Sequence, residues 1–271
     1  MELGVLINLD GKDIENKFVQ VFDMGFKFCQ LCCWNTKLMT KENAEIINGL
    51  CKKYNIKISS FWCGWSGPAV WNFYEGPLTL GLVPKEYRFQ RMNELKCGSD
   101  FAKLLNVENV ATHMGFLPEN PESEDYRSLV AAICDASNYM KNNGQWLLFE
   151  TGQETPVTLR RTIEDVGTGN LGINLDPANL IMYGKANPTD ALDVFGEFVR
   201  DVHAKDGCYP KNGKDLGDEM PLGKGKVDFP KFIKKLKDVG YDKTLTIERE
   251  ITGEEQIKDI KLAKELLEKL I

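Results

Sequence analysis

The chain has 271 residues, of which 42% are hydrophobic and 27% are charged, and it carries a formal net charge of −6 with an isoelectric point of about 5.2. This length is near the ~250 residues of a typical (β/α)8 barrel and favours one domain over residues 1–271. The acidic balance, with both signs interspersed, disfavours nucleic acid as a partner.

The amino-terminal residues MELGVLINLDGKD contain no basic segment and no cleavage site, and no apolar run approaches the ~18 residues of a membrane span. We therefore expect a cytoplasmic protein without a membrane segment. The eight cysteines are irregularly spaced, which favours reduced thiols. Cys29 and Cys32 form a CxxC pair, but the period of a strand puts them on opposite faces, so we expect no redox or zinc site there.

The chain begins with three predicted strands, which cover residues 4–8, 26–34 and 56–62. The first leads to a helix near residues 13–24, and Gly25 just beyond it is a helix-stop signal. The second leads to a helix after Thr40, whose hydroxyl can cap the amino terminus. These units predict alternating strands and helices.

Residues 63–87 follow the third strand and contain four glycines, three prolines and several aromatic residues. This segment is longer than an ordinary connection, so we expect no regular element in it and interpret it as a lid. A helix near residues 88–105, a strand ending at His113 and a helix near residues 124–142 follow.

Four apolar runs in the second half each end on a polar side chain, and we predict that they are the last four strands. QWLLFE ends at Glu150, LGINLD at Asp176, VRDVH at His203 and KTLTIE at Glu248. Eight strand-helix alternations without a linker predict a single-domain (β/α)8 TIM barrel. In such a barrel the carboxyl ends of the strands form the active face.

Three carboxylates and one imidazole at corresponding strand ends are costly to desolvate unless a cation meets them. Taken singly, each could be a solvated strand end or a helix cap. Together, Glu150, Asp176, His203 and Glu248 predict a divalent metal site. Oxygen-rich ligation suits Mn²⁺ or Mg²⁺, and the imidazole also tolerates Co²⁺ or Zn²⁺.

Further residues are candidates for substrate contact. His113 could hydrogen-bond the substrate or shuttle a proton, or be a packed histidine. Lys205, two residues beyond His203, could contact a substrate oxygen or phosphate, or pair with Asp206. Trp34 and Trp62 could form a wall against a sugar, or be hydrophobic filler beneath the lid.

The glycine- and lysine-rich residues 223–226 could cradle a phosphate in the loop after the seventh strand, which is a known barrel position for such sites. The alternative is a solvated glycine turn.

Several motifs together resemble the xylose isomerase-like TIM barrel superfamily, in its branch of sugar phosphate isomerases and epimerases. The resemblance spans nearly the whole chain and rests on Glu150, LDPANL around Asp176, H-x-K-D over residues 203–206, P-x-G-x-G-x-V-D-F over residues 221–229, and TIERE around Glu248. It implies a divalent cation, often manganese, held by Glu150, Asp176, His203 and Glu248. It also implies that Glu150 and Glu248 are the acid and base.

Two positions depart from the free-ketose 3-epimerases of that superfamily, which have a histidine and an arginine where this chain has Asn179 and Tyr209. The motifs after His203 instead resemble pentulose- and hexulose-phosphate epimerases and keto-inositol dehydratases. Asn179 remains a candidate substrate contact. Endonucleases of the related abasic-DNA family use a histidine-rich three-metal site, which two histidines cannot supply.

The resemblance therefore implies an isomerase or epimerase of a small keto-sugar or sugar phosphate, acting through an ene-diolate. One alternative is a metal-dependent lyase, either a keto-inositol-type dehydratase or a 3-keto-glycoside eliminase. Another is a non-catalytic sugar-binding barrel, because fold alone does not settle function. The sequence leaves the substrate, its phosphorylation, the metal in vivo and the oligomeric state open, a homo-oligomer included.

Overall fold

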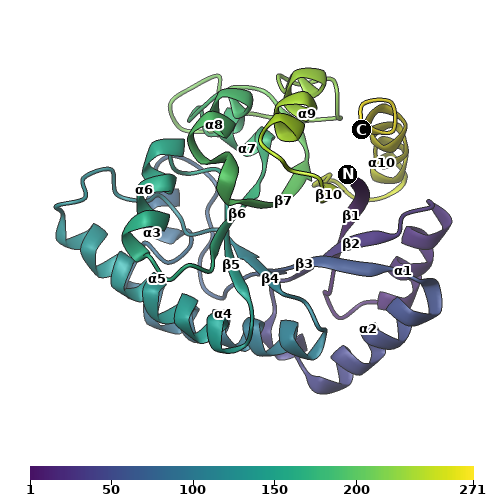
Figure 1. Ribbon diagram of the computed structural model, residues 1–271, viewed down its shortest axis with the longest axis horizontal. Coiled ribbons are helices and arrows are strands. Elements are labelled where there is room, and N and C mark those ends of the chain that lie inside the picture. Colours follow the sequence, from purple (N-terminus) through teal and green to yellow (C-terminus); the bar gives the residue numbers. More distant parts are fainter.

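Eight parallel strands close into a barrel in the computed structural model, which covers residues 1–271 (Figure 1). Around the barrel the strands follow the order β1-β10-β7-β6-β5-β4-β3-β2. They are β1 (Glu2–Asn8), β2 (Phe28–Cys33), β3 (Lys57–Cys63), β4 (Asn109–Thr112), β5 (Trp146–Glu150), β6 (Leu171–Leu175), β7 (Val199–Ala204) and β10 (Thr244–Ile247). The predicted (β/α)8 TIM barrel is confirmed.

Helices surround the barrel on the outside, and α10 contacts β1 where the two chain termini lie near each other (Figure 1). The outer helices are α1 (Ile14–Asp23), α2 (Lys41–Tyr54), α4 (Lys85–Leu104), α5 (Glu124–Asn142), α6 (Pro156–Val166), α8 (Pro188–Phe195), α9 (Phe229–Asp238) and α10 (Glu254–Leu267). Two shorter helices are α3 (Gly76–Thr79) and α7 (Pro177–Met182), and two 3-10 turns are η1 (Thr36–Leu38) and η2 (Gly196–Phe198). No helix combines the length and apolar character that crossing a membrane requires.

Two residues that were predicted to mark helix ends do so in the structure. The Thr40 side chain accepts a hydrogen bond from the Asn43 amide and caps α2. Gly25, just beyond α1, has a φ of 74°, which a glycine adopts without steric cost. One boundary differs: α4 begins at Lys85, three residues before the predicted start, because Pro84 already supplies a suitable amino-terminal position.

The packing divides into an outer and an inner part. The large core of 56 buried residues fills the space between strands and helices. A small cluster of six lies inside the mouth and consists of Cys32, Trp62, Trp65, Leu80, Ala111 and Leu148. Cys29 belongs to the outer core and Cys32 to the inner cluster, so the two do point to opposite faces. All eight cysteines are free thiols.

The lid segment, residues 63–87, contains more regular structure than predicted, because it includes α3 and the start of α4. Asn72 in this segment forms an isolated antiparallel bridge with Asp215, and the Phe73 amide donates to the Lys214 carbonyl at 2.9 Å. The segment after β3 is thereby tied to the segment after β7. That second segment also contains the two-stranded sheet of β8 (Asp206–Gly207) and β9 (Glu219–Met220).

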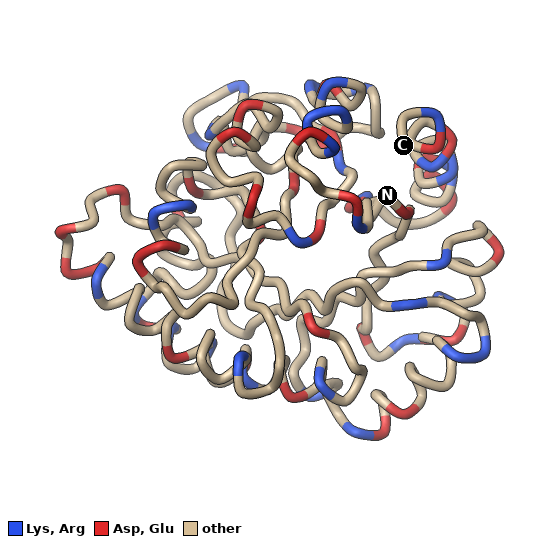
Figure 2. Tube along the Cα trace, viewed as in Figure 1, with Lys and Arg blue, Asp and Glu red and all other residues tan.

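Charged residues of both signs are interspersed over the outer helices (Figure 2). Many form exposed pairs, such as Lys96 with Asp135 between α4 and α5.

Candidate metal and active site

The four predicted metal ligands meet at the carboxyl ends of their strands. Glu150 is the last residue of β5, Asp176 follows β6, His203 lies in β7 and Glu248 follows β10. One ligand atom from each lies within 4.8 Å of all the others. Glu150, Asp176 and His203 are buried, and 12% of the Glu248 side chain remains exposed. The sequence thus identified a real spatial cluster.

A hydrogen bond beneath the cluster fixes the orientation of the His203 ring. Its Nε2 donates to Gln30 Oε1 at 2.6 Å, and the Gln30 amide nitrogen donates to Asp201 Oδ2 at 3.3 Å. Asn174 Nδ2 also lies 3.1 Å from Nε2, but the shorter contact to a carbonyl oxygen places the proton on Nε2. Nδ1 therefore faces the carboxylates, and it is the unprotonated nitrogen when the ring is neutral.

Asp201 is itself held firmly inside the barrel. Its Oδ2 accepts hydrogen bonds from the hydroxyls of Ser59 and Ser60, at 3.0 Å for Ser59, and its Oδ1 accepts from the Val202 amide at 3.0 Å. The register of β3 against β2 shifts at this point, so that two consecutive serines reach one carboxylate. Burial raises the Asp201 pKa, and these donors offset only part of the effect.

The cluster leaves three buried atoms without a hydrogen-bond partner: Asp176 Oδ2, His203 Nδ1 and Glu248 Oε2. His203 Nδ1 lies 3.0 Å from Glu248 Oε2, 3.4 Å from Glu150 Oε1 and 3.7 Å from Asp176 Oδ2. Acceptors that face one another in a buried site are destabilising unless a cation lies between them. Three carboxylate oxygens and one imidazole nitrogen fit a hard or borderline divalent ion such as Mn²⁺.

The pKa values show how strongly the cluster favours a central positive charge. Burial lowers the pKa of His203, but Glu248 and Glu150 outweigh it and hold that pKa well above its usual value. Burial raises the pKa of Glu150, yet His113 and His203 bring it below the ordinary glutamate value. The pKa of Glu248 is lowered as well, because Lys205 and His203 outweigh burial. Both glutamates are therefore ionised.

Lys205 lies on the inward face of the barrel, as predicted, and is 2% exposed. Its Nζ is 3.6 Å from Asp176 Oδ2, 3.3 Å from Glu248 Oε2 and 3.0 Å from Glu250 Oε1. Burial lowers its pKa, but these carboxylates raise it well above the usual value. The alternative pairing of Lys205 with Asp206 is wrong, because the partners are Asp176, Glu248 and Glu250.

The Asp206 carboxylate instead binds backbone amides. Its Oδ2 accepts from the amides of Gly223 and Gly225 at 2.9 and 2.8 Å, and its Oδ1 accepts from Gly207 and Val227 at 2.8 and 3.0 Å. A Cβ on Gly225 would lie 2.2 Å from Asp206 Oδ1, so this close approach requires glycine. The predicted phosphate cradle at residues 223–226 is therefore not supported.

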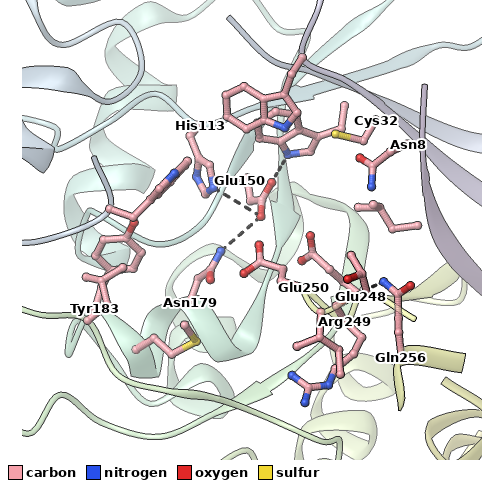
Figure 3. A pocket seen from close by; sticks show the side chains of 18 residues that line it. Asn8, Cys32, His113, Glu150, Asn179, Tyr183, Glu248, Arg249, Glu250 and Gln256 are labelled. Atoms are coloured by element: carbon pink, nitrogen blue, oxygen red, sulfur yellow. Dashed lines mark hydrogen bonds and ion pairs between the residues drawn. The ribbon is translucent and has the colours of Figure 1, made fainter. Parts of the chain in front are cut away.

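Glu150 is held by three neighbours (Figure 3). Trp62 Nε1 donates to its Oε2, Asn179 Nδ2 donates to its Oε1 at 3.3 Å, and His113 Nε2 lies 3.6 Å from the same Oε1. His113 Nδ1 is buried without a partner, and its ring lies between those of Trp62 and Trp71, with centroids at 5.7 and 5.3 Å. Trp62 thus has a polar role besides the predicted wall.

A cavity of about 390 Å³ opens above the cluster (Figure 3). Its lining residues come from the strands, from the segments that follow them and from helices α7 and α10. They are Leu6, Asn8, Cys32, Trp34, Trp62, Trp71, His113, Glu150, Asn179, Met182, Tyr183, Leu216, Glu248, Arg249, Glu250, Ile251, Thr252 and Gln256. Of the predicted site residues, Trp34, Trp62, His113, Glu150, Asn179 and Glu248 line the cavity. Asp176, His203 and Lys205 are buried and are not among the lining residues.

Sequence reasoning missed several residues of this site. Gln30 is a lone amide within the apolar run FKFCQLCCW, which is a signal for an inward polar contact. Glu250 follows Glu248 by two residues, so the period of a strand could have placed it on the same face. Arg249 and Trp71 carried no comparable signal, because their places depend on loop conformation.

The chain is similar in sequence and fold to several known proteins. A model of the xylose isomerase-like TIM barrel family matches residues 18–270. The solved structure of a xylose isomerase domain protein from Planctomyces limnophilus is 36% identical with a TM-score of 0.93, and the match covers 99% of this chain and 96% of that one. An uncharacterized protein from Methanocaldococcus jannaschii is 27% identical, over 96% of this chain and 85% of its own length.

More distant solved structures share the fold. A D-tagatose 3-epimerase-like protein is 20% identical with a TM-score of 0.77, over 100% of this chain and 98% of that one. At 14% and 17% identity, a D-psicose 3-epimerase and a probable 3-DHS dehydratase from Bacillus anthracis also match. The structural neighbours therefore include sugar epimerases and a dehydratase.

Proposed function

We propose that this chain, which belongs to the xylose isomerase-like TIM barrel family, is a divalent-metal-dependent isomerase or epimerase of a small keto-sugar. The observation that carries the proposal is the convergence of four ligand atoms within 4.8 Å beneath a cavity of about 390 Å³. A cavity of that size suits a small-molecule substrate. We propose Mn²⁺ as the ion, with Mg²⁺, Co²⁺ and Zn²⁺ as alternatives.

The bound ion would polarise the substrate carbonyl and acidify the adjoining carbon-bound hydrogen. Of the four ligands, Glu248 keeps the largest exposed fraction, 12%, and both it and Glu150 line the cavity. Their lowered pKa values keep both carboxylates ionised and able to accept a proton. We assign them the transfer of the proton to and from the carbon next to the carbonyl.

Epimerisation needs proton transfer on two faces of a planar ene-diolate. Glu150 belongs to β5 and Glu248 follows β10, and β6 and β7 separate these strands in the barrel. Carboxylates from strands this far apart reach a bound substrate from different sides. His113 lies 3.6 Å from Glu150 and lines the cavity, so it is placed to hydrogen-bond the substrate or to relay a proton.

A lyase remains the second candidate, and Lys205 favours it. Its ammonium is held in the protonated state 3.3 Å from Glu248 and 3.0 Å from Glu250, beside the cavity. Instead of being reprotonated, an ene-diolate beside this positive charge can expel a β-hydroxyl, which leaves as water with the proton that the glutamate took from the adjoining carbon. The two reactions differ in product mass, since isomerisation conserves the mass and dehydration removes one water.

The test compares Glu150→Gln and Glu248→Gln with the wild-type protein over a panel of keto-sugars at saturating Mn²⁺. Each amide keeps the shape but cannot act as a base, so we expect each variant to lose about 10²- to 10⁴-fold in turnover. Each variant should still exchange the substrate hydrogen with solvent on one face, through the remaining carboxylate. Glu122→Gln, at an exposed position that does not line the cavity, is the matched control and should keep full activity.

Full turnover in either active-site variant at saturating metal would contradict the two-glutamate mechanism. His113 would then become the preferred second acid-base group.

A further inference from the structure

Resting on the proposed function, we infer that the substrate is an electrically neutral carbohydrate and that the pocket selects against sugar phosphates. The observation behind this inference is the charge of the cavity wall. Three carboxylates line it, from Glu150, Glu248 and Glu250, whereas Arg249 is the one lysine or arginine among the lining residues. A phosphorylated substrate brings up to two further negative charges into this space.

Arg249, the one lysine or arginine that lines the cavity, is not free to bind a phosphate. Arg249 Nη1 lies 2.9 Å from Glu219 Oε2 and its Nε lies 2.9 Å from Asp259 Oδ2. All three side chains are nearly buried, with 10% to 11% exposed. The guanidinium therefore already has two carboxylate partners, and a phosphate would have to displace them.

Lys205 is also already paired, because three carboxylates lie within 3.6 Å of its Nζ. A divalent ion and Lys205 together supply three positive charges against the four carboxylates of Glu150, Asp176, Glu248 and Glu250. The metal-loaded site therefore has no positive excess with which to attract a dianion.

The two backbone features that bind phosphate in other barrels are also occupied by the protein's own anions. The amides of the glycine-rich loop donate to Asp206, which takes the place that an anionic ligand would have. Helix α10 begins beside the cavity with no side-chain cap, but its first turn contains Glu254 and Glu255. These carboxylates already meet the positive end of the helix dipole.

The remaining lining groups match the surface of an uncharged sugar. Asn8, Asn179 and Gln256 offer neutral donors and acceptors for hydroxyl groups. Trp34, Trp62 and Trp71 form one aromatic wall, with the Trp34 centroid 4.9 Å from Trp62 and 6.3 Å from Trp71. Such a wall packs against the apolar face of a sugar ring.

The test uses matched pairs, D-fructose with D-fructose 6-phosphate and D-ribulose with D-ribulose 5-phosphate. Binding to the Mg²⁺-loaded protein is measured by isothermal titration calorimetry, with inorganic phosphate as a further ligand. We expect each free sugar to bind at least ~100-fold more tightly than its phosphorylated partner, and inorganic phosphate not to compete. Turnover is followed separately by product analysis.

A variant that adds a positive charge to the cavity wall gives a second test of the inference. Thr252→Arg adds a guanidinium at an exposed position of the cavity wall. This change should raise the affinity for the phosphorylated sugars at least ~10-fold relative to the affinity for the free sugars. Thr252→Gln adds a polar side chain without charge and should leave that ratio of affinities unchanged.

The outcomes separate this inference from the proposed function. If the free sugar binds more tightly but neither sugar is converted, the neutral substrate class stands and the isomerase proposal fails. If the phosphorylated sugar binds as well as or better than the free one, the inference is overturned, whether or not turnover occurs. Binding of neither member of either pair also overturns it.

Discussion

Substitution of Gln30 tests whether side chains inside the barrel orient His203 for metal binding. Its Oε1 accepts the hydrogen bond from His203 Nε2 at 2.6 Å, and this bond directs the Nδ1 lone pair at the carboxylates. Gln30→Met keeps the length and volume of the side chain but removes the acceptor. The ring could then rotate or take the other tautomer, which puts a proton on the nitrogen that must bind the ion.

The expected losses of metal affinity and of stability follow from the contacts that Gln30→Met removes. Removal of an outer partner of a metal-bound histidine typically lowers metal affinity about 10- to 100-fold. The variant also leaves His203 Nε2 without its closest acceptor and Asp201 without its Gln30 donor, at 3.3 Å. Unpaired buried groups cost about 1–3 kcal/mol, so we expect the metal-free protein to lose stability in that range.

The assay is Mn²⁺ binding by isothermal titration calorimetry, with urea unfolding of the metal-free protein as the second measurement. Ser59→Ala is the matched control, because it removes one bond to Asp201 and leaves the bond between Gln30 and His203 intact. The control should bind Mn²⁺ within about threefold of wild type, which is smaller than the tenfold lower limit for an outer partner. Equal Mn²⁺ affinity in Gln30→Met and wild type would refute the assigned role of Gln30.

Two further predictions concern stability and the lid. Burial raises the pKa of Glu154 to about 8 from 4.5, so between these pH values the folded protein holds a proton that the unfolded chain has released. Stability should therefore fall with rising pH over this interval, by up to about 1.4 kcal/mol per pH unit from this group. In urea unfolding, Glu154→Gln should remove this fall, and an unchanged pH profile would contradict the assignment. The lid segment, residues 63–87, contributes Trp71 to the cavity and is tied to Asp215. Hydrogen exchange in this segment should therefore slow when a substrate sugar binds, and equal exchange would argue against a lid.

The strand ends could be predicted because a closed parallel barrel brings all its carboxyl ends to one mouth. Once the strands were assigned correctly, the four predicted ligands could be placed together; they are Glu150, Asp176, His203 and Glu248. The inward direction of Lys205 followed in the same way from the period of two. These inferences depend on regular backbone geometry, which local sequence specifies well.

The partners of Lys205 and the role of the glycine-rich loop could not be predicted, because the chain leaves regular geometry after Lys205. Asp206 begins a short strand whose return brings Gly223 and Gly225 within hydrogen-bonding distance of its carboxylate. Nothing in the spacing of these residues distinguishes a loop that binds phosphate from one that binds the protein's own aspartate.

The aromatic segment was predicted from its composition and length to be a lid over the site. Its short helix α3 was missed, because four residues beginning with Gly76 and Pro77 carry almost no periodic signal. Its attachment to Asp215 depends on a contact between residues more than 140 positions apart. Such contacts follow from the closed barrel and leave no local pattern.

A crystal structure determined with Mn²⁺ present, with data collected at the manganese absorption edge, tests the central claim most directly. We predict a single strong anomalous peak per chain, about 2.0–2.3 Å from one carboxylate oxygen each of Glu150, Asp176 and Glu248 and from Nδ1 of His203. No peak at these four side chains, or a peak elsewhere in the protein alone, would contradict the metal site from which the proposed chemistry is derived.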